Sequence, residues 1–215
     1  MSKSRVKLYL IFTGLLYVAG AVLSIVFGVQ KIAHLTIYML TLNLALVFFT
    51  TGLPRSKRYW FILGAVGLAG FMAEAIGTNT GRLFGNYRYL DNLGPKIFMT
   101  PLLIIGLWAF VSWFGLAAAK ASKLSKGQGL IAGAFAVTVY DMWLEPFAIR
   151  SRLWVWNGGG PGFFNYLCWF ILAVVFISIL WESRLRMKNQ FVIWWVAGMQ
   201  LTYFIVIYFI AVLKI

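Results

Sequence analysis

The sequence predicts an all-α fold, a polytopic transmembrane helix bundle of about seven spans. Hydrophobic residues make up 62% of the 215 positions, the mean hydropathy is +0.85, and only 11% of the residues are charged. Soluble domains contain roughly 45–50% apolar residues, whereas each spanning helix requires about 20 mostly apolar residues in a row. Apolar runs and short separators occupy the whole chain, so we expect one integral membrane domain over residues 1–215.

Seven apolar windows predict the spans. They run from Leu8 to Val29, Ile32 to Leu53, Tyr59 to Gly77, Ile97 to Ala119, Gly129 to Ile149, Phe163 to Trp181 and Phe191 to Leu213. The first window follows a basic segment as a signal peptide would, and Ala19-Gly20-Ala21 resembles a cleavage site, but the apolar run continues to Val29. We therefore interpret it as an uncleaved first helix.

Two separators are longer than the others and differ in composition. Residues 78–96 and 150–162 contain Gly, Asn, Tyr, Trp and Arg. This mixture is typical of ordered loops that pack on a bundle. We expect both segments to be structured.

The basic residues predict the direction of insertion. With a cytoplasmic N-terminus, each of four cytoplasmic segments holds three Lys or Arg residues, and the opposite side holds seven of the 19. An excess of Lys and Arg marks the cytoplasmic side, so we expect an N-in, C-out protein of the cytoplasmic membrane with both long separators outside. The net charge of +14 then reflects topology and contact with anionic lipids, not nucleic-acid binding.

Several classes of site lack the residues they need. His34 is the only histidine, which excludes histidine-cluster di-iron sites. The single Cys168 can form neither an internal disulfide nor a multi-cysteine metal site. No D-x-x-x-D pair could hold magnesium and a diphosphate, and the seventh span has a lysine, Lys214, only at its end, so a retinal Schiff base has no obvious anchor. We expect no metal and no cofactor.

Three of the five acidic residues, Glu74, Asp141 and Glu145, fall late in predicted spans. An ionisable side chain at a helix centre costs about 2.5–3.5 kcal/mol on insertion scales, so such residues usually face a bundle interior or a wet cavity and mark function. Asp141 and Glu145 are four residues apart and share one helix face. The third and fifth spans run in the same direction, so Glu74 should lie at the same level.

These carboxylates allow three interpretations. They can pair with Arg82, Arg88, Arg150 or Arg152 and hold the loops to the helices, or they can form a proton or ion pathway. Alternatively, crowding and desolvation keep at least one carboxyl group protonated near pH 7, so that it can donate a proton. A structural and a catalytic role can coexist.

Aromatic residues make up 18% of the chain, and many flank the three acids. Part of this enrichment is the interfacial belt of a membrane protein. An acid beside aromatic faces also suits carbocation chemistry on an alkene, because a π-face stabilises a cation without reacting with it as a nucleophile would.

Four blocks of sequence resemble the CruF family of carotenoid hydratases, which are membrane proteins of carotenoid biosynthesis. Residues 74–89 read EAIGTNTGRLFGNYRY and are followed by Leu93-Gly94-Pro95, Pro101 and Trp108. The later blocks are DMWLEP at 141–146, WVW at 154–156 and PGFFNYLCW at 161–169. The resemblance extends from about the third span through the sixth, and the first two spans and the last carry no matching motif.

The resemblance implies hydration of the terminal C=C, the 1,2 position, of the acyclic ψ-end of a carotenoid such as γ-carotene or lycopene, without a cofactor. We expect Asp141 to donate the proton and Glu74 or Glu145 to orient the water, with Tyr87, Trp143 and Trp169 lining the cation site. The wider set of expected substrate-binding residues is Tyr87, Tyr89, Trp143, Trp154, Trp156, Asn165, Trp169 and Arg82. The expected partners are a carotenoid within the bilayer, water and membrane lipids.

Two other functions stay open at this point. A carotenoid cyclase uses the same protonation but lets a double bond of the substrate capture the cation. A transporter or lipid-binding scaffold would use the acids to relay protons or to hold the loops.

Overall fold

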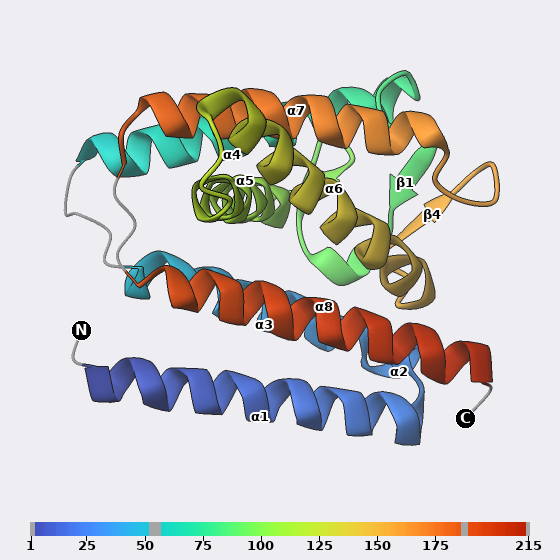
Figure 1. The fold of residues 1–215 in the computed structure, drawn as a ribbon. Coiled ribbons are helices and arrows are strands. Elements are labelled where there is room, and N and C mark those ends of the chain that lie inside the picture. Colours follow the sequence, from blue (N-terminus) through green and yellow to red (C-terminus); the bar gives the residue numbers. More distant parts are fainter. Residues whose placement is uncertain (1–2, 52–56, 186–188, 214–215) are drawn as a thin grey trace.

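The computed structural model describes residues 3–51, 57–185 and 189–213, most of which are helical (Figure 1). Seven helical segments are long in these ranges. They are α1 (Lys3–Phe27), α2 with η1 and α3 (Val29–Ile32, Ala33–Leu35, Thr36–Thr50), α4 (Lys57–Thr80), α5 (Leu103–Ala121), α6 (Lys126–Arg150), α7 (Phe163–Glu182) and α8 (Gln190–Leu213). The all-α helical bundle expected from the sequence is confirmed.

Six of these segments are long and apolar enough to cross a membrane, counted over the described residues. They are Val6–Phe27, Val29–Thr50, Lys57–Thr80, Leu103–Ala121, Phe163–Glu182 and Gln190–Ile210. The remaining long helix, α6, packs against α5 and α7 but carries Asp141 and Glu145, which lower its hydropathy. The chain is a multi-pass integral membrane protein, and a seventh span through α6 stays a prediction.

The N-in, C-out orientation also stays a prediction. Four of the basic residues in its charge count lie outside the described residues: Arg55, Arg186, Lys188 and Lys214. Figure 1 shows α1, α4, α6 and α8 running towards the end of the bundle that carries β1 and β4, and α7 running away from it. The two long separators therefore lie at the same end, as expected.

Helix α5 lies at the centre of the bundle, in contact with α3, α4, α6, α7 and α8. Glycines allow two of these neighbours to approach closely, which is common where membrane helices pack. A Cβ atom at Gly70 of α4 would lie 2.2 Å from Cγ of Trp108, and one at Gly133 of α6 would lie 2.4 Å from the carbonyl oxygen of Gly115. Helix α1 packs mainly on α8, at the edge of the bundle (Figure 1).

The two long separators are ordered and pair with each other. Strand β1 (Tyr87–Tyr89) is antiparallel to β4 (Trp154–Trp156), with Tyr87 opposite Trp156 and Tyr89 opposite Trp154. Between β1 and α5 lie η2 (Asp91–Leu93) and a second antiparallel pair, β2 (Lys96–Ile97) and β3 (Thr100–Pro101). The prediction of ordered loops is confirmed.

The beginning of the predicted fourth span is wrong. Residues 97–102 precede α5 and form the β2–β3 hairpin, although they are apolar. Phe98 and Met99 have φ angles of 49° and 60°, outside the right-handed helical region, and Pro101 follows. A proline inside a helix removes a hydrogen bond and clashes with the preceding turn, so α5 begins after it.

Candidate functional site

The carboxylates of three buried acidic residues line one cavity, which we call the carboxylate cavity. Glu74 comes from α4, and Asp141 and Glu145 come from α6; their exposed fractions are 4%, 1% and 3%. The cavity measures about 20 Å³, and its other lining residues are Tyr87, Tyr89, Trp154, Trp156, Asn165 and Trp169. A buried water requires roughly 10–15 Å³ by this measure, so the cavity has room for one water molecule.

Strand β1 directs two phenols to Glu74. The hydroxyl of Tyr87 donates a hydrogen bond to Oε2 of Glu74, and the hydroxyl of Tyr89 donates one to the same oxygen at 3.0 Å. Alternate residues of a strand face the same side, which explains why a Y-x-Y segment converges on one acceptor. Burial, and then the nearby Glu74, hold the pKa of both phenols well above its ordinary value, so both remain donors.

Strand β4 directs two indoles to Glu145 in the same way. Nε1 of Trp154 donates to Oε2 of Glu145 at 3.0 Å, and Nε1 of Trp156 donates at 2.9 Å. The two strands are paired, so the sheet presents two donors to each of two carboxylates. The W-x-W segment is therefore a positioning element for Glu145.

Asp141 has a different environment from the two glutamates. Its Oδ2 accepts one hydrogen bond, from Nδ2 of Asn165 at 3.1 Å. Its Oδ1 is buried and has no hydrogen-bond partner among the described residues. One oxygen of Asp141 is therefore available to a group inside the site.

Ion pairs do not neutralise these three acids in the described part of the chain. The two ion pairs there join Lys96 to Asp91 and Lys126 to Glu182, both outside the carboxylate cavity. In the described residues, the hydrogen bonds to the buried acids come from Tyr, Trp and Asn side chains and not from the arginines considered as partners. In the same ranges no group of three His, Cys, Asp or Glu side chains is arranged to hold a metal ion.

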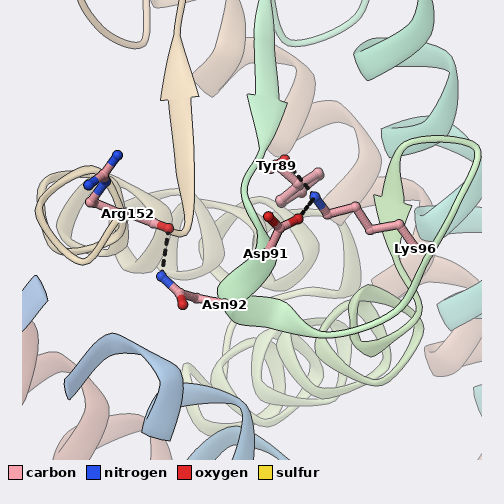
Figure 2. A network of polar contacts seen from close by, with 5 residues as sticks. All are labelled: Tyr89, Asp91, Asn92, Lys96 and Arg152. Carbon is pink, nitrogen blue, oxygen red and sulfur yellow. Dashed lines mark hydrogen bonds and ion pairs between the residues drawn. The ribbon is translucent and has the colours of Figure 1, made fainter. Parts of the chain in front are cut away.

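A polar network outside the cavity holds β1 in place (Figure 2). Nζ of Lys96 donates to the carbonyl oxygen of Tyr89 at 3.0 Å and to Oδ1 of Asp91 at 2.8 Å. Nδ2 of Asn92 donates to the carbonyl oxygen of Arg152 at 3.1 Å, which joins the two loops. The hydrogen bond and the positive charge of Lys96 keep the pKa of the exposed Asp91 below its ordinary value, so the link persists at neutral pH.

Two residues expected at the site lie elsewhere. Arg82 is exposed, and its described polar contact is a backbone one, from its N–H to Oγ1 of Thr80. Trp143 is half-buried on α6 and packs edge-on against Tyr208 of α8, with ring centroids 6.0 Å apart. Neither residue lines the carboxylate cavity.

A second cavity of about 50 Å³ adjoins the first, and we call it the aromatic cavity. The two share four lining residues: Glu74, Tyr89, Trp154 and Trp169. Trp169 stacks on Trp108, with ring centroids 4.4 Å apart and an interplanar angle of 20°. The other walls are apolar and aromatic side chains of α3, α5, α6, α8 and the loops: Leu40, Leu93, Ile104, Leu107, Val111, Tyr140, Leu144, Phe147, Leu153 and Phe204.

Sequence reasoning missed the residues that α3 and α8 contribute. Leu40 and Phe204 belong to spans without a matching motif, and apolar residues there look like any lipid-facing side chain. One signal was present: Gln200 is a polar residue within an apolar span. It lies buried and accepts a hydrogen bond from the hydroxyl of Tyr140 at 2.8 Å.

This arrangement combines buried acids, room for one water and an apolar aromatic compartment. A comparison with protein families gives a match to the model described as "Carotenoid biosynthesis protein" over residues 20–215. Neither the curated proteins nor the solved structures contain a significant match to the chain. The matched range includes every residue of both cavities, and we conclude that the chain belongs to the family of carotenoid biosynthesis proteins.

Proposed function

We propose that the protein is a cofactor-independent carotenoid hydratase. It adds water across the terminal C=C, the 1,2 position, of an acyclic ψ-end group such as that of γ-carotene or lycopene and gives a tertiary alcohol. The observation that carries the proposal is the one-water cavity among three carboxylates, adjoining an aromatic cavity inside the helix bundle. An alkene end group suits the aromatic cavity, and the water suits the carboxylate cavity.

Asp141 is the proposed proton donor. A carboxylic acid needs one oxygen free to carry the proton towards the substrate, and Oδ1 of Asp141 is the carboxylate oxygen that is buried without a partner in the described residues. The single bond from Asn165 fixes the other oxygen. Asn165 thereby acts as a positioning residue for Asp141.

Glu145 or Glu74 is the proposed acceptor for the proton of the water. Each has Oε2 held by two donors, which fixes the carboxylate and leaves Oε1 for the water. Glu145 lies one helical turn from Asp141 on the same face of α6. Replacing each glutamate by glutamine separates the two, because the true base will show the larger loss of turnover.

The reaction is balanced without any further reagent. Asp141 gives its proton to the less substituted carbon of the terminal C=C, and a tertiary cation forms at the neighbouring carbon. The water oxygen bonds to that carbon and passes one proton to the glutamate, from which it returns to Asp141. The net change is alkene plus water to tertiary alcohol.

Aromatic faces stabilise the cationic intermediate. Trp169, Trp154 and Tyr89 line both cavities, so the cation would form between their rings. A cation at an aromatic face gains about 0.5–2 kcal/mol, more when water is excluded. The stack of Trp169 on Trp108 holds the first of these rings in a fixed orientation.

The one-water cavity favours hydration over cyclisation. In a cyclase the substrate must fold so that its own double bond reaches the cation, and a water beside the cation would divert it. Here polar oxygens line the carboxylate cavity, which adjoins the aromatic cavity, and such a site suits a nucleophilic water. Two of the three buried acids, Glu74 and Glu145, have fixed partners from the loops, which gives a proton-conducting transporter less support.

Expression in a host that accumulates lycopene or γ-carotene tests the proposal. We expect new pigments heavier than the substrate by one or two water molecules and more polar on chromatography. An isomeric product of unchanged mass would identify a cyclase. Unchanged pigment in membranes that contain the full-length protein would refute both enzymatic functions.

A further inference from the structure

A cavity larger than these two lies away from the carboxylates, between α1, the α2–η1–α3 segment and α8. It measures about 170 Å³, and we call it the entry cavity. Its walls include Leu23 of α1, Ile32 of α2 and Met39 of α3. An apolar cavity of about 150 Å³ accommodates a benzene-sized ligand, so this one can hold a short stretch of an isoprenoid chain.

The entry cavity adjoins the proposed reaction site, because the two share lining residues. Leu40, Phe147 and Phe204 line both the entry cavity and the aromatic cavity. Phe147 and Phe204 stack on each other, with ring centroids 4.8 Å apart, and form a flat aromatic boundary. The three cavities therefore form one series that ends at the carboxylates.

Several polar groups around the entry cavity form hydrogen bonds within the protein. The amide of Asn43 donates to the hydroxyl of Tyr17, Tyr203 shares a hydrogen bond with Ser24 at 2.9 Å, and Gln200 accepts from Tyr140. A ligand there would meet hydrocarbon and ring surfaces. The walls thus suit an apolar chain and offer little to a polar headgroup.

The rim of the entry cavity lies within membrane-spanning segments. Ala19 on α1 is exposed, and Leu35 at the end of η1 is 39% exposed. Both belong to candidate spans, Val6–Phe27 and Val29–Thr50. An opening at these residues faces lipid tails and not water, because a spanning segment crosses the hydrocarbon region.

We infer that a long isoprenoid substrate enters sideways from the bilayer between α1 and the α2–η1–α3 segment. Its reacting end reaches the carboxylates, and its chain lies in the entry cavity and continues into the lipid. The substrate then remains in an apolar medium throughout, which avoids the cost of exposing its surface to water. This inference rests on the proposed hydratase function and adds the route and the part of the site that selects long substrates.

Two variants and two substrates test the route in isolated membranes. Ala19→Phe narrows the rim and Leu23→Trp fills part of the entry cavity without touching the aromatic cavity, whereas Val18→Phe places a Phe on an adjacent position that is 63% exposed and does not line the cavity. Lycopene is compared with a short acyclic terpene that carries the same terminal alkene. The short substrate needs only the aromatic cavity, so its rate of hydration shows whether the catalytic site and the fold are intact in each variant.

We expect Ala19→Phe and Leu23→Trp to lower lycopene hydration at least about tenfold, as misfits in apolar pockets do. Hydration of the short terpene should stay within about twofold of the wild type, and Val18→Phe should leave both rates unchanged. Wild-type rates on lycopene in both narrowing variants, or equal losses on both substrates, would overturn the route. A wild-type protein that hydrates neither substrate would instead refute the proposed function.

Pigment binding gives a second readout that needs no turnover. An Asp141→Asn protein purified from lycopene-accumulating cells should retain pigment, measured by its visible absorbance per protein. Adding Ala19→Phe should remove most of that absorbance, and adding Val18→Phe should not. Equal retention in the two double variants would also overturn the route.

Discussion

Replacing Asp141 by asparagine tests the proposed chemistry most directly. The amide has almost the same shape, can accept the hydrogen bond from Asn165 with its oxygen, and places its NH₂ group where Oδ1 now lies. Asp141 is 1% exposed and packs within α6. A volume-conserving change of this kind usually costs less than about 1.5 kcal/mol of stability. The protein should therefore still insert and fold.

The rate should fall far more than the stability. General acid catalysis by a positioned side chain contributes about 10²–10⁴-fold, and here no cation forms without the proton. A loss of at least about 100-fold is expected, equivalent to about 2.7 kcal/mol of transition-state stabilisation. The assay measures hydrated carotenoid per unit of membrane-inserted protein, by chromatography and mass spectrometry.

Glu182→Gln is the matched control for this prediction. It makes the same chemical change, from a carboxylate to its amide, at an exposed residue that pairs with Lys126 outside the cavity. Its turnover should stay within about twofold of the wild type, as for most surface substitutions. If Asp141→Asn hydrates within about threefold of the wild type at equal protein level, the assignment of Asp141 as the acid is refuted.

Three further substitutions probe the supports of the site. Trp156→Phe removes one of two donors to the buried Glu145; a hydrogen bond to a charged group contributes about 1.5–3 kcal/mol, so turnover should drop about tenfold or more. Gly70→Ala puts a methyl group 2.2 Å from the ring of Trp108, and such overpacking costs about 1–3 kcal/mol, seen as a lower unfolding temperature in detergent and reduced hydration. Lys96→Met releases the β1 network of Figure 2, and hydration should fall several-fold with little change in protein level.

Each of these has a control within the same chain. Trp60→Phe alters an exposed indole, and Gly64→Ala adds a methyl group on α4 where nothing lies within 4 Å. Lys126→Met breaks the other described ion pair, at Glu182. All three should behave like the wild type. If a control loses as much hydration activity as its partner variant, the loss reflects general damage to the fold. The contact removed in the partner variant then has no specific role in hydration.

The fold follows largely from hydrophobic length, which a sequence displays directly. All seven predicted windows correspond to helical segments in the described residues, because an apolar run of about 20 residues has few alternatives in a bilayer. The prediction failed at 97–102, where the run is equally apolar but positive φ angles and Pro101 produce a hairpin. Hydropathy measures transfer into lipid and is insensitive to backbone conformation.

The candidate site was predictable where its residues are costly to bury. Glu74, Asp141 and Glu145 stand out because an ionisable carboxyl group in an apolar segment is costly to bury and usually marks function. The structure brings all three to one cavity. Trp154, Trp156, Tyr87 and Tyr89 follow from the sequence blocks, but their division into two pairs of donors does not. That division depends on the antiparallel register of β1 and β4, which joins segments far apart in the chain.

The sequence by itself determined the membrane bundle, the family resemblance and the identity of the buried acids, since each depends on local composition or on short motifs. The tertiary structure alone decided which carboxylate has a buried oxygen without a partner in the described residues, which aromatic rings meet, and which residues line each cavity. Those properties arise from side chains on α1, α3, α6 and α8 that pack together in space. An apolar residue carries no mark in the sequence that distinguishes a cavity wall from a lipid-facing surface.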